Sequence, residues 1–245
     1  MRALVLSLGL LAVAVPASAD QELPIFDAHM HYSHDAWTVV PPAQVVDILK
    51  KAGVKRAMVS SSNNEGTRML QDAAPGMIVP ELRPYRSRGE ISTWVRDASL
   101  VPFLEDMLSK RKYVAIGEFH VYGADADLPN VRRVVELAKQ YGLYLHSHSD
   151  SDAVARHFQQ DPSARVLWAH SGFERPEKIR EMLRRYPTLW CDLAFLTSHA
   201  SNGKVAPGWR ELFIEFPDRF VVGTDTFTPE RWHYVIEHAR WSRQW

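Results

Sequence analysis

The stretch "IFDAHMH", residues 25–31, decides how the rest of the sequence is interpreted. Its apolar start is typical of a buried strand. Because side chains on a strand alternate between its two faces, His29 and His31 are expected to point to the same side. Two imidazoles on one face of a strand suit the binding of one metal ion, although the same spacing also arises by chance. The interpretation therefore depends on whether other residues complete a ligand set.

The first twenty residues, "MRALVLSLGLLAVAVPASAD", have the layout of a secretory signal. Arg2 precedes an apolar run from Ala3 to Val15, and small residues follow at positions 17–19. We expect cleavage after Ala19, a signal peptide over residues 1–19 and one domain over residues 20–245. No later stretch is long and apolar enough to predict a membrane span. The sequence thus predicts an exported protein without membrane insertion, most simply a periplasmic one.

The charge balance limits the classes of partner. Lysine plus arginine and aspartate plus glutamate both total 29, so the formal net charge is zero. Proteins that bind nucleic acid normally carry a basic excess, so a small-molecule substrate is expected and nucleic acid is not. The single cysteine, Cys191, excludes a disulfide within this chain. The sequence does not predict the oligomeric state.

Short apolar runs alternate with amphipathic helical patterns along the chain. Eight such runs occur, at residues 25–28, 55–60, 77–80, 113–117, 143–145, 166–169, 189–193 and 220–223. Strands that alternate with helices predict a parallel sheet, and eight strands are the number that closes into a (β/α)₈ TIM barrel. An open doubly wound sheet is the alternative, but it usually has a glycine-rich turn after its first strand. Here the first strand ends in His-Met-His, which favours the barrel.

Five of the apolar runs end in a residue that can bind metal. In a barrel, the carboxyl ends of the strands meet at one mouth, where active sites lie. Imidazole and carboxylate together suit Zn²⁺, with Mn²⁺ and Fe²⁺ as alternatives. The candidate ligands at these strand ends are His29, His31, Glu118, His146, His170 and Asp225.

This order of ligands resembles the amidohydrolase superfamily of metal-dependent hydrolases. That resemblance implies that His29 and His31 match the first pair, Glu118 the position that bridges two metals, His146 and His170 the single histidines, and Asp225 the final aspartate. Glutamate in place of a bridging lysine makes the site look like the TatD-type and related branches. If Glu118 instead forms a salt bridge to an arginine, one metal ion is expected in place of two.

The resemblance implies a reaction in which metal-activated water cleaves a C–O, C–N or P–O bond of a small molecule. Asp225, on the metal and next to that water, is the residue expected to accept its proton. For the substrate, Arg83 and Arg86 are candidates because arginine beside aromatic residues can hold a carboxylate or phosphate. His148 follows His146 at strand spacing and is a further candidate.

Three other functions remain open from the sequence. One is a TatD-type nuclease or phosphoesterase, which shares the bridging glutamate. A second is a decarboxylase of the same superfamily with a single metal ion. The third is an exported protein that binds metal without turnover. A substrate panel and a metal count distinguish these possibilities.

Overall fold

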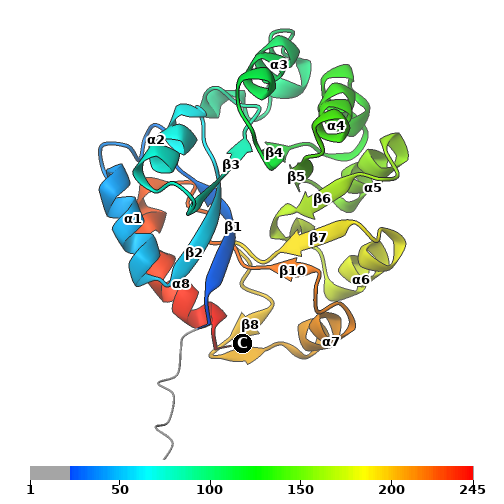
Figure 1. The fold of residues 1–245 in the computed structure, drawn as a ribbon. Coiled ribbons are helices and arrows are strands. Elements are labelled where there is room, and N and C mark those ends of the chain that lie inside the picture. Colours follow the sequence, from blue (N-terminus) through cyan, green and yellow to red (C-terminus); the bar gives the residue numbers. More distant parts are fainter. Residues whose placement is uncertain (1–22, 245) are drawn as a thin grey trace, which may run out of the picture.

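Eight parallel strands form an inner ring in the computed structural model, which describes residues 23–244, and helices surround the ring (Figure 1). The predicted signal peptide, residues 1–19, lies outside the described residues. The strands follow the chain in the order β1 (Ile25–His31), β2 (Val54–Ser60), β3 (Ile78–Leu82), β4 (Ala115–His120), β5 (Tyr144–His148), β6 (Arg165–Trp168), β7 (Leu189–Asp192) and β10 (Phe220–Val221). All eight predicted strands are present, so the predicted single-domain TIM barrel is confirmed.

Backbone hydrogen bonds close the ring between the last strand and the first. The N–H of Ala28 donates to the carbonyl of Val222 over 2.8 Å, and the N–H of Asp225 donates to the carbonyl of His29 over 2.8 Å. These bonds join the two ends of the sheet, which an open doubly wound sheet leaves apart. They also bring Asp225 beside the histidines of β1.

Each connection between neighbouring strands contains a helix that covers the outside of the sheet. The α-helices are α1 (Pro42–Lys51), α2 (Glu65–Ala73), α3 (Leu100–Lys110), α4 (Pro129–Tyr141), α5 (Ser151–Gln160), α6 (Pro176–Arg185), α7 (Pro207–Glu215) and α8 (Val235–Ser242). Shorter 3₁₀ turns are η1 (Arg88–Glu90), η2 (Trp94–Arg96), η3 (Gly123–Asp127), η4 (Ala169–Phe173) and η5 (Pro229–Tyr234). The two-residue strands β8 (Ala200–Ser201) and β9 (Lys204–Val205) pair as a hairpin before α7. No helix in this part of the chain combines the length and apolar character that a bilayer crossing requires.

Local sequence explains where several helices begin and end. Proline occupies the first turn of α1, α4, α6 and α7, where its missing N–H costs no hydrogen bond. Helix α4 ends at Gly142, whose φ of +66° is in the left-handed region that favours glycine. The helix starts bound the loops at the carboxyl ends of the strands, and Gly142 bounds the short loop that leads from α4 into β5.

An apolar layer fills one end of the barrel interior. It is built from small and medium side chains of β1, β2, β3, β4 and β6: Ala28, Met58, Val79, Ala115 and Leu167. Tyr144, Trp190 and Val221 from the remaining strands pack against it. Side chains from all eight strands can meet only inside the barrel, so this apolar layer lies in the interior, below the polar residues of the mouth.

Candidate metal centre at the barrel mouth

The two histidines of β1 bring their Nε2 atoms to within 3.1 Å of each other, and both rings are buried. The Nδ1 of His29 lies 3.1 Å from a carboxylate oxygen of Asp192. The Nδ1 of His31 lies 3.2 Å from the carbonyl of Ser60, 2.9 Å from the hydroxyl of the same residue and 3.2 Å from the guanidinium of Arg83. When both Nδ1 atoms donate to these oxygens, the Nε2 atoms carry lone pairs. Two lone pairs this close repel each other unless a cation lies between them.

Two carboxylates complete the group around these nitrogens. The Oδ1 of Asp225 lies 3.3 Å from Nε2 of His31 and 3.6 Å from Nε2 of His29. Glu118 places one oxygen 3.2 Å from Nε2 of His31 and the other 3.6 Å from Nε2 of His29. Ligands about 2.0–2.2 Å from a tetrahedral zinc ion lie about 3.3–3.6 Å from one another. His29, His31 and Asp225 offer ligand atoms close enough to one another to hold an ion, and Glu118 does so with His29 and His170. The donors therefore fit divalent metal ions in their chemistry, with Glu118 beside the group of His29, His31 and Asp225.

The electrostatics of the group also favour a bound cation. Burial alone would lower the pKa of His29, but the negative charges of Asp192, Glu118 and Asp225 raise it well above its ordinary value. Burial alone would raise the pKa of Asp225, but His29 and His31 lower it to about 2. The pKa of Glu118 is likewise held well below its ordinary value against the effect of burial, chiefly by the charge of His29. The carboxylates are thus ionised, and their combined charge attracts cations.

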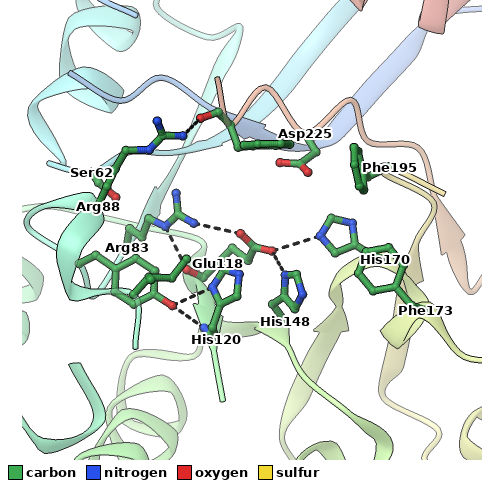
Figure 2. Close-up of a pocket in the computed structure, with 13 residues that line it drawn as sticks. Ser62, Arg83, Arg88, Glu118, His120, His148, His170, Phe173, Phe195 and Asp225 are labelled. Atoms are coloured by element: carbon green, nitrogen blue, oxygen red, sulfur yellow. Dashed lines mark hydrogen bonds and ion pairs between the residues drawn. The ribbon is translucent and has the colours of Figure 1, made fainter. Parts of the chain in front are cut away.

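Glu118 also contacts a second pair of histidines, as Figure 2 shows. Its Oε1 lies 2.8 Å from Nδ1 of His148 and 3.4 Å from Nε2 of His170. The Nδ1 of His170 lies 2.8 Å from the carbonyl of Ala194, which leaves Nε2 facing the carboxylate. On the other oxygen, Oε2, Glu118 accepts a hydrogen bond of 3.0 Å from Arg83. Glu118 therefore lies between the two histidine pairs and forms an ion pair with an arginine at the same time.

His146 occupies a different environment from the other predicted ligands. Its Nδ1 lies 3.0 Å from Glu81, and its Nε2 lies 3.2 Å from Asp192. Burial lowers the pKa of His146, but the charge of Glu81 and the hydrogen bonds to both carboxylates raise it overall, to about 9. Both nitrogens thus contact carboxylates, although His29, His146 and Asp192 also offer ligand atoms close enough to one another to hold an ion. Its role as a ligand stays a prediction, and the contacts favour a role in holding Glu81 and Asp192.

Three residues that hold the site together were missed from the sequence: Asp192 at the end of β7, Glu81 in β3 and Ser60 at the end of β2. Each stands at or beside the carboxyl end of an apolar run, as the predicted ligands do. For Asp192 and Glu81 the available signal was an acidic residue at or beside the end of an apolar run, whereas Ser60 carried no such signal.

Of the three predicted substrate-binding residues, two lie at the cavity and one does not. Arg83 and His148 line a cavity at the mouth, whereas Arg86 is not among its lining residues. The guanidinium of Arg86 forms ion pairs with Glu90 and Asp97 and donates to the hydroxyl of Ser99 over 2.6 Å. These partners come from the same loop between β3 and α3. The structure thus places Arg86 in a role that stabilises this loop, away from the predicted substrate contact.

The cavity has a volume of about 340 Å³, within the usual range for small-molecule sites. Glu118, Asp225, His148 and His170 line one part of it, and Phe173 and Phe195 lie on an apolar side (Figure 2). Phe227 also lines the cavity and completes this apolar wall. The two arginines of the lining, Arg83 and Arg88, are paired with Glu118 and Asp35. The cavity therefore offers polar groups beside an aromatic surface.

Comparison with known proteins agrees with this geometry. The sequence profile of a family described as "Amidohydrolase" matches residues 74–243, more than half of the chain. No curated protein sequence matches the chain.

Among solved structures, an uncharacterised TIM-barrel protein from Bordetella bronchiseptica is similar, with a TM-score of 0.62, 12% identity and 90% of each chain covered. A probable 2-pyrone-4,6-dicarboxylic acid hydrolase from Acinetobacter baumannii has a TM-score of 0.56 and 12% identity, over 91% of this chain and 96% of that one. A sugar phosphate isomerase/epimerase from Parabacteroides distasonis has a TM-score of 0.58 and 13% identity, over 95% and 98%. At these identities the likeness establishes the fold alone.

Proposed function

The chain belongs to the amidohydrolase family of metal-dependent hydrolases, and from that premise we propose that its barrel mouth hydrolyses a C–O or C–N bond of a small organic molecule. The observation that carries the proposal is the approach of the His29 and His31 Nε2 atoms to 3.1 Å, with oxygens of Asp225 and Glu118 beside them at the wall of the cavity. The TatD-type branch assignment stays a prediction.

A first divalent ion, Zn²⁺ in preference to Mn²⁺ or Fe²⁺, would be held by His29, His31, Glu118 and Asp225. When bound, such an ion lowers the pKa of a coordinated water and polarises the bond under attack. A second ion would be held more weakly by Glu118, His148 and His170, because this group has three donors and the side chain of His148 is 20% exposed.

The remaining chemistry belongs to the side chains themselves. Asp225 is ionised, and its Oδ1 faces the histidine pair, so it can accept a proton from attacking water and transfer it to the leaving group. Asp192 keeps the Nδ1 proton of His29 in place. The phenylalanine wall excludes water from one side of the reacting group and contacts its apolar part.

The lining also favours some substrates over others. A phosphate group needs free cationic partners, and both arginines of the described lining are already paired with carboxylates. A carboxylic ester, lactone or amide with an apolar group makes no such demand and matches the aromatic wall. We therefore place phosphoesters and nucleic acids below these compounds as substrates.

The first experiment tests the reaction. Zinc-loaded protein is assayed on lactones, esters, amides, phosphoesters and aromatic carboxylic acids, and the best substrate is used with Asp225→Asn. We expect hydrolysis of a carbonyl compound, and at least a roughly 100-fold loss of kcat in a variant that keeps its metal, a typical loss for a missing general base. A near-normal rate in Asp225→Asn contradicts its role. Release of CO₂ indicates a decarboxylase, and a metal-loaded protein inert on the whole panel indicates a binding protein.

The second experiment tests the ligands by metal content, measured by mass spectrometry of dialysed protein. We expect two ions in the parent, one in His148→Ala and two in His146→Gln, since glutamine can still donate to one of the carboxylates that His146 contacts. Loss of an ion from His146→Gln, with two ions kept in His148→Ala, would restore His146 as the ligand. One ion in the parent would indicate that Glu118 stays in its ion pair with Arg83 and does not bridge two metal ions.

A further inference from the structure

A buried tyrosine and a histidine of the cavity form a closely connected pair. Tyr85 follows β3 and is 1% exposed, and His120 is the last residue of β4. The hydroxyl oxygen of Tyr85 lies 2.9 Å from Nδ1 of His120, and the backbone N–H of the same histidine donates to that oxygen. Trp94 adds a hydrogen bond of 2.8 Å from its indole N–H to the carbonyl of His120.

These contacts determine which nitrogen of His120 carries the proton. A backbone N–H can only donate, so the Tyr85 oxygen accepts that bond and has one proton of its own to give. Burial raises the pKa of Tyr85, so the phenol keeps this proton. Among the described residues no other acceptor lies within hydrogen-bond distance of this buried hydroxyl, so its proton is donated to Nδ1, which is then an acceptor. In the neutral imidazole the N–H is consequently at Nε2.

The ring of His120 is held in a defined position at the cavity surface. It stacks on His148, with ring centroids 4.1 Å apart and an angle of 26° between the planes. Both rings line the cavity (Figure 2). Within residues 23–244, Nε2 of His120 makes no hydrogen bond. The backbone N–H, the carbonyl oxygen and Nδ1 of this residue each have a partner. A fixed donor without a protein acceptor, at the wall of a substrate cavity, is available to a ligand.

We propose that His120 binds substrate by donating its Nε2–H to a substrate oxygen, and that Tyr85 is the positioning residue that holds the ring in this tautomer. This inference rests on the proposed function, because it concerns the same cavity. The ligand it predicts has a carbonyl or carboxylate oxygen at His120 and an apolar group against Phe173 and Phe195. His120 offers a ligand atom within 4.8 Å of those of Glu118 and His148, but with Nδ1 accepting from Tyr85 and a proton on Nε2 its ring has no free lone pair for a metal ion.

The tautomer is tested directly by NMR on protein labelled with ¹⁵N-histidine, with the His120 signals assigned from their loss in His120→Gln. We expect Nε2 to carry the proton and Nδ1 to have the shift of an acceptor nitrogen. In Tyr85→Phe we expect a mixture of the two tautomers with unchanged metal content. A proton on Nδ1 in the parent protein overturns the proposal. This measurement needs neither metal nor substrate, so it succeeds or fails independently of the proposed hydrolysis.

Ligand contact is tested with benzoate as the probe, by calorimetric titration of zinc-loaded protein. A hydrogen bond to a charged ligand contributes about 1.5–3 kcal/mol, so His120→Phe, which keeps an aromatic ring but no donor, should weaken the Kd roughly tenfold or more. His120→Gln, which keeps an N–H, should bind benzoate nearly as the parent does, and His233→Gln on the exposed part of η5 should be unchanged. Equal affinity in His120→Phe, or no benzoate binding by the parent, overturns the proposal.

Discussion

At the scale of single residues, the carboxylate of Asp192 connects three histidines of the site. Its Oδ2 lies 3.1 Å from Nδ1 of His29 and 3.2 Å from Nε2 of His146, and its Oδ1 accepts the backbone N–H of His170 over 3.0 Å. Burial raises the pKa of Asp192, but the charge of His29 and the hydrogen bonds from His146 and His29 lower it far below the ordinary value. A permanently ionised acceptor at this point orients His29 for metal binding through Nε2.

Asp192→Asn should therefore weaken metal binding without removing any ligand. An amide is a weaker acceptor for the Nδ1 proton of His29, and loss of such an orienting carboxylate typically costs about 10–100-fold in metal affinity. A competition titration with a zinc chelator measures this change. Asp218→Asn, at an exposed position before β10, is the matched control and should bind zinc as the parent does. Equal affinities in the two variants would show that Asp192 does not orient His29.

At the scale of the elements, the start of a barrel strand is set by the residue at which the preceding helix ends. Gly142 ends α4 with φ +66° and ψ +40°, and its N–H contacts the carbonyls of Ala138 and Lys139. The chain then enters β5, which carries His146 and His148. The left-handed conformation at this residue therefore sets where β5 begins.

Gly142→Ala should destabilise the protein by about 1 kcal/mol, because a Cβ disfavours the left-handed conformation. Urea unfolding followed by circular dichroism measures the free energy of unfolding. Gly89→Ala is the control, since Gly89 lies in η1, has no φ in the left-handed region and has only Ser87 near the position of a new Cβ, at 3.9 Å. A loss in Gly89→Ala as large as in Gly142→Ala would argue against the conformational cause.

At the scale of the whole molecule, α5 is attached to the barrel through a buried histidine that stays neutral. His157 of α5 lies 3.1 Å from the hydroxyl of Ser147 in β5, and its ring packs against Phe119 of β4 with centroids 5.8 Å apart. Burial lowers the pKa of His157 from 6.5 to about 4, only partly opposed by the charge of Asp127. Folding therefore depends on pH through a group remote from the cavity.

The sign of this dependence follows from proton binding. Between pH 6.5 and 4 the unfolded chain protonates His157 and the folded protein does not, so the free energy of unfolding falls as the pH falls. From pH 7 to pH 5 the loss is about 2 kcal/mol for this group. His157→Gln should remove about this difference when urea unfolding is compared at the two pH values, whereas His233→Gln should keep it. An unchanged pH dependence in His157→Gln would refute the assignment.

Several features of the site could be predicted from sequence because they depend on periodicity and order alone. Alternation of apolar runs with helical patterns predicts eight parallel strands. Parallel strands in one barrel end at one mouth, so His29, His31, Glu118, His170 and Asp225 come together wherever the strands are correctly identified. The signal-peptide prediction for residues 1–19 concerns a part of the chain that the structure does not describe.

By itself, the sequence determined the barrel and the residue types at its mouth, because strand period and chain order are local properties. Only the tertiary structure decided which groups meet. His148 and not His146 contacts Glu118, and Asp192 orients His29 although the two lie 163 residues apart in the sequence. Arg86 forms an ion pair within its own loop. Hydrogen-bond partners are set by the stagger and twist of neighbouring strands, and a shift of one residue moves a side chain to the opposite face. That geometry exists only after the ring of strands has closed.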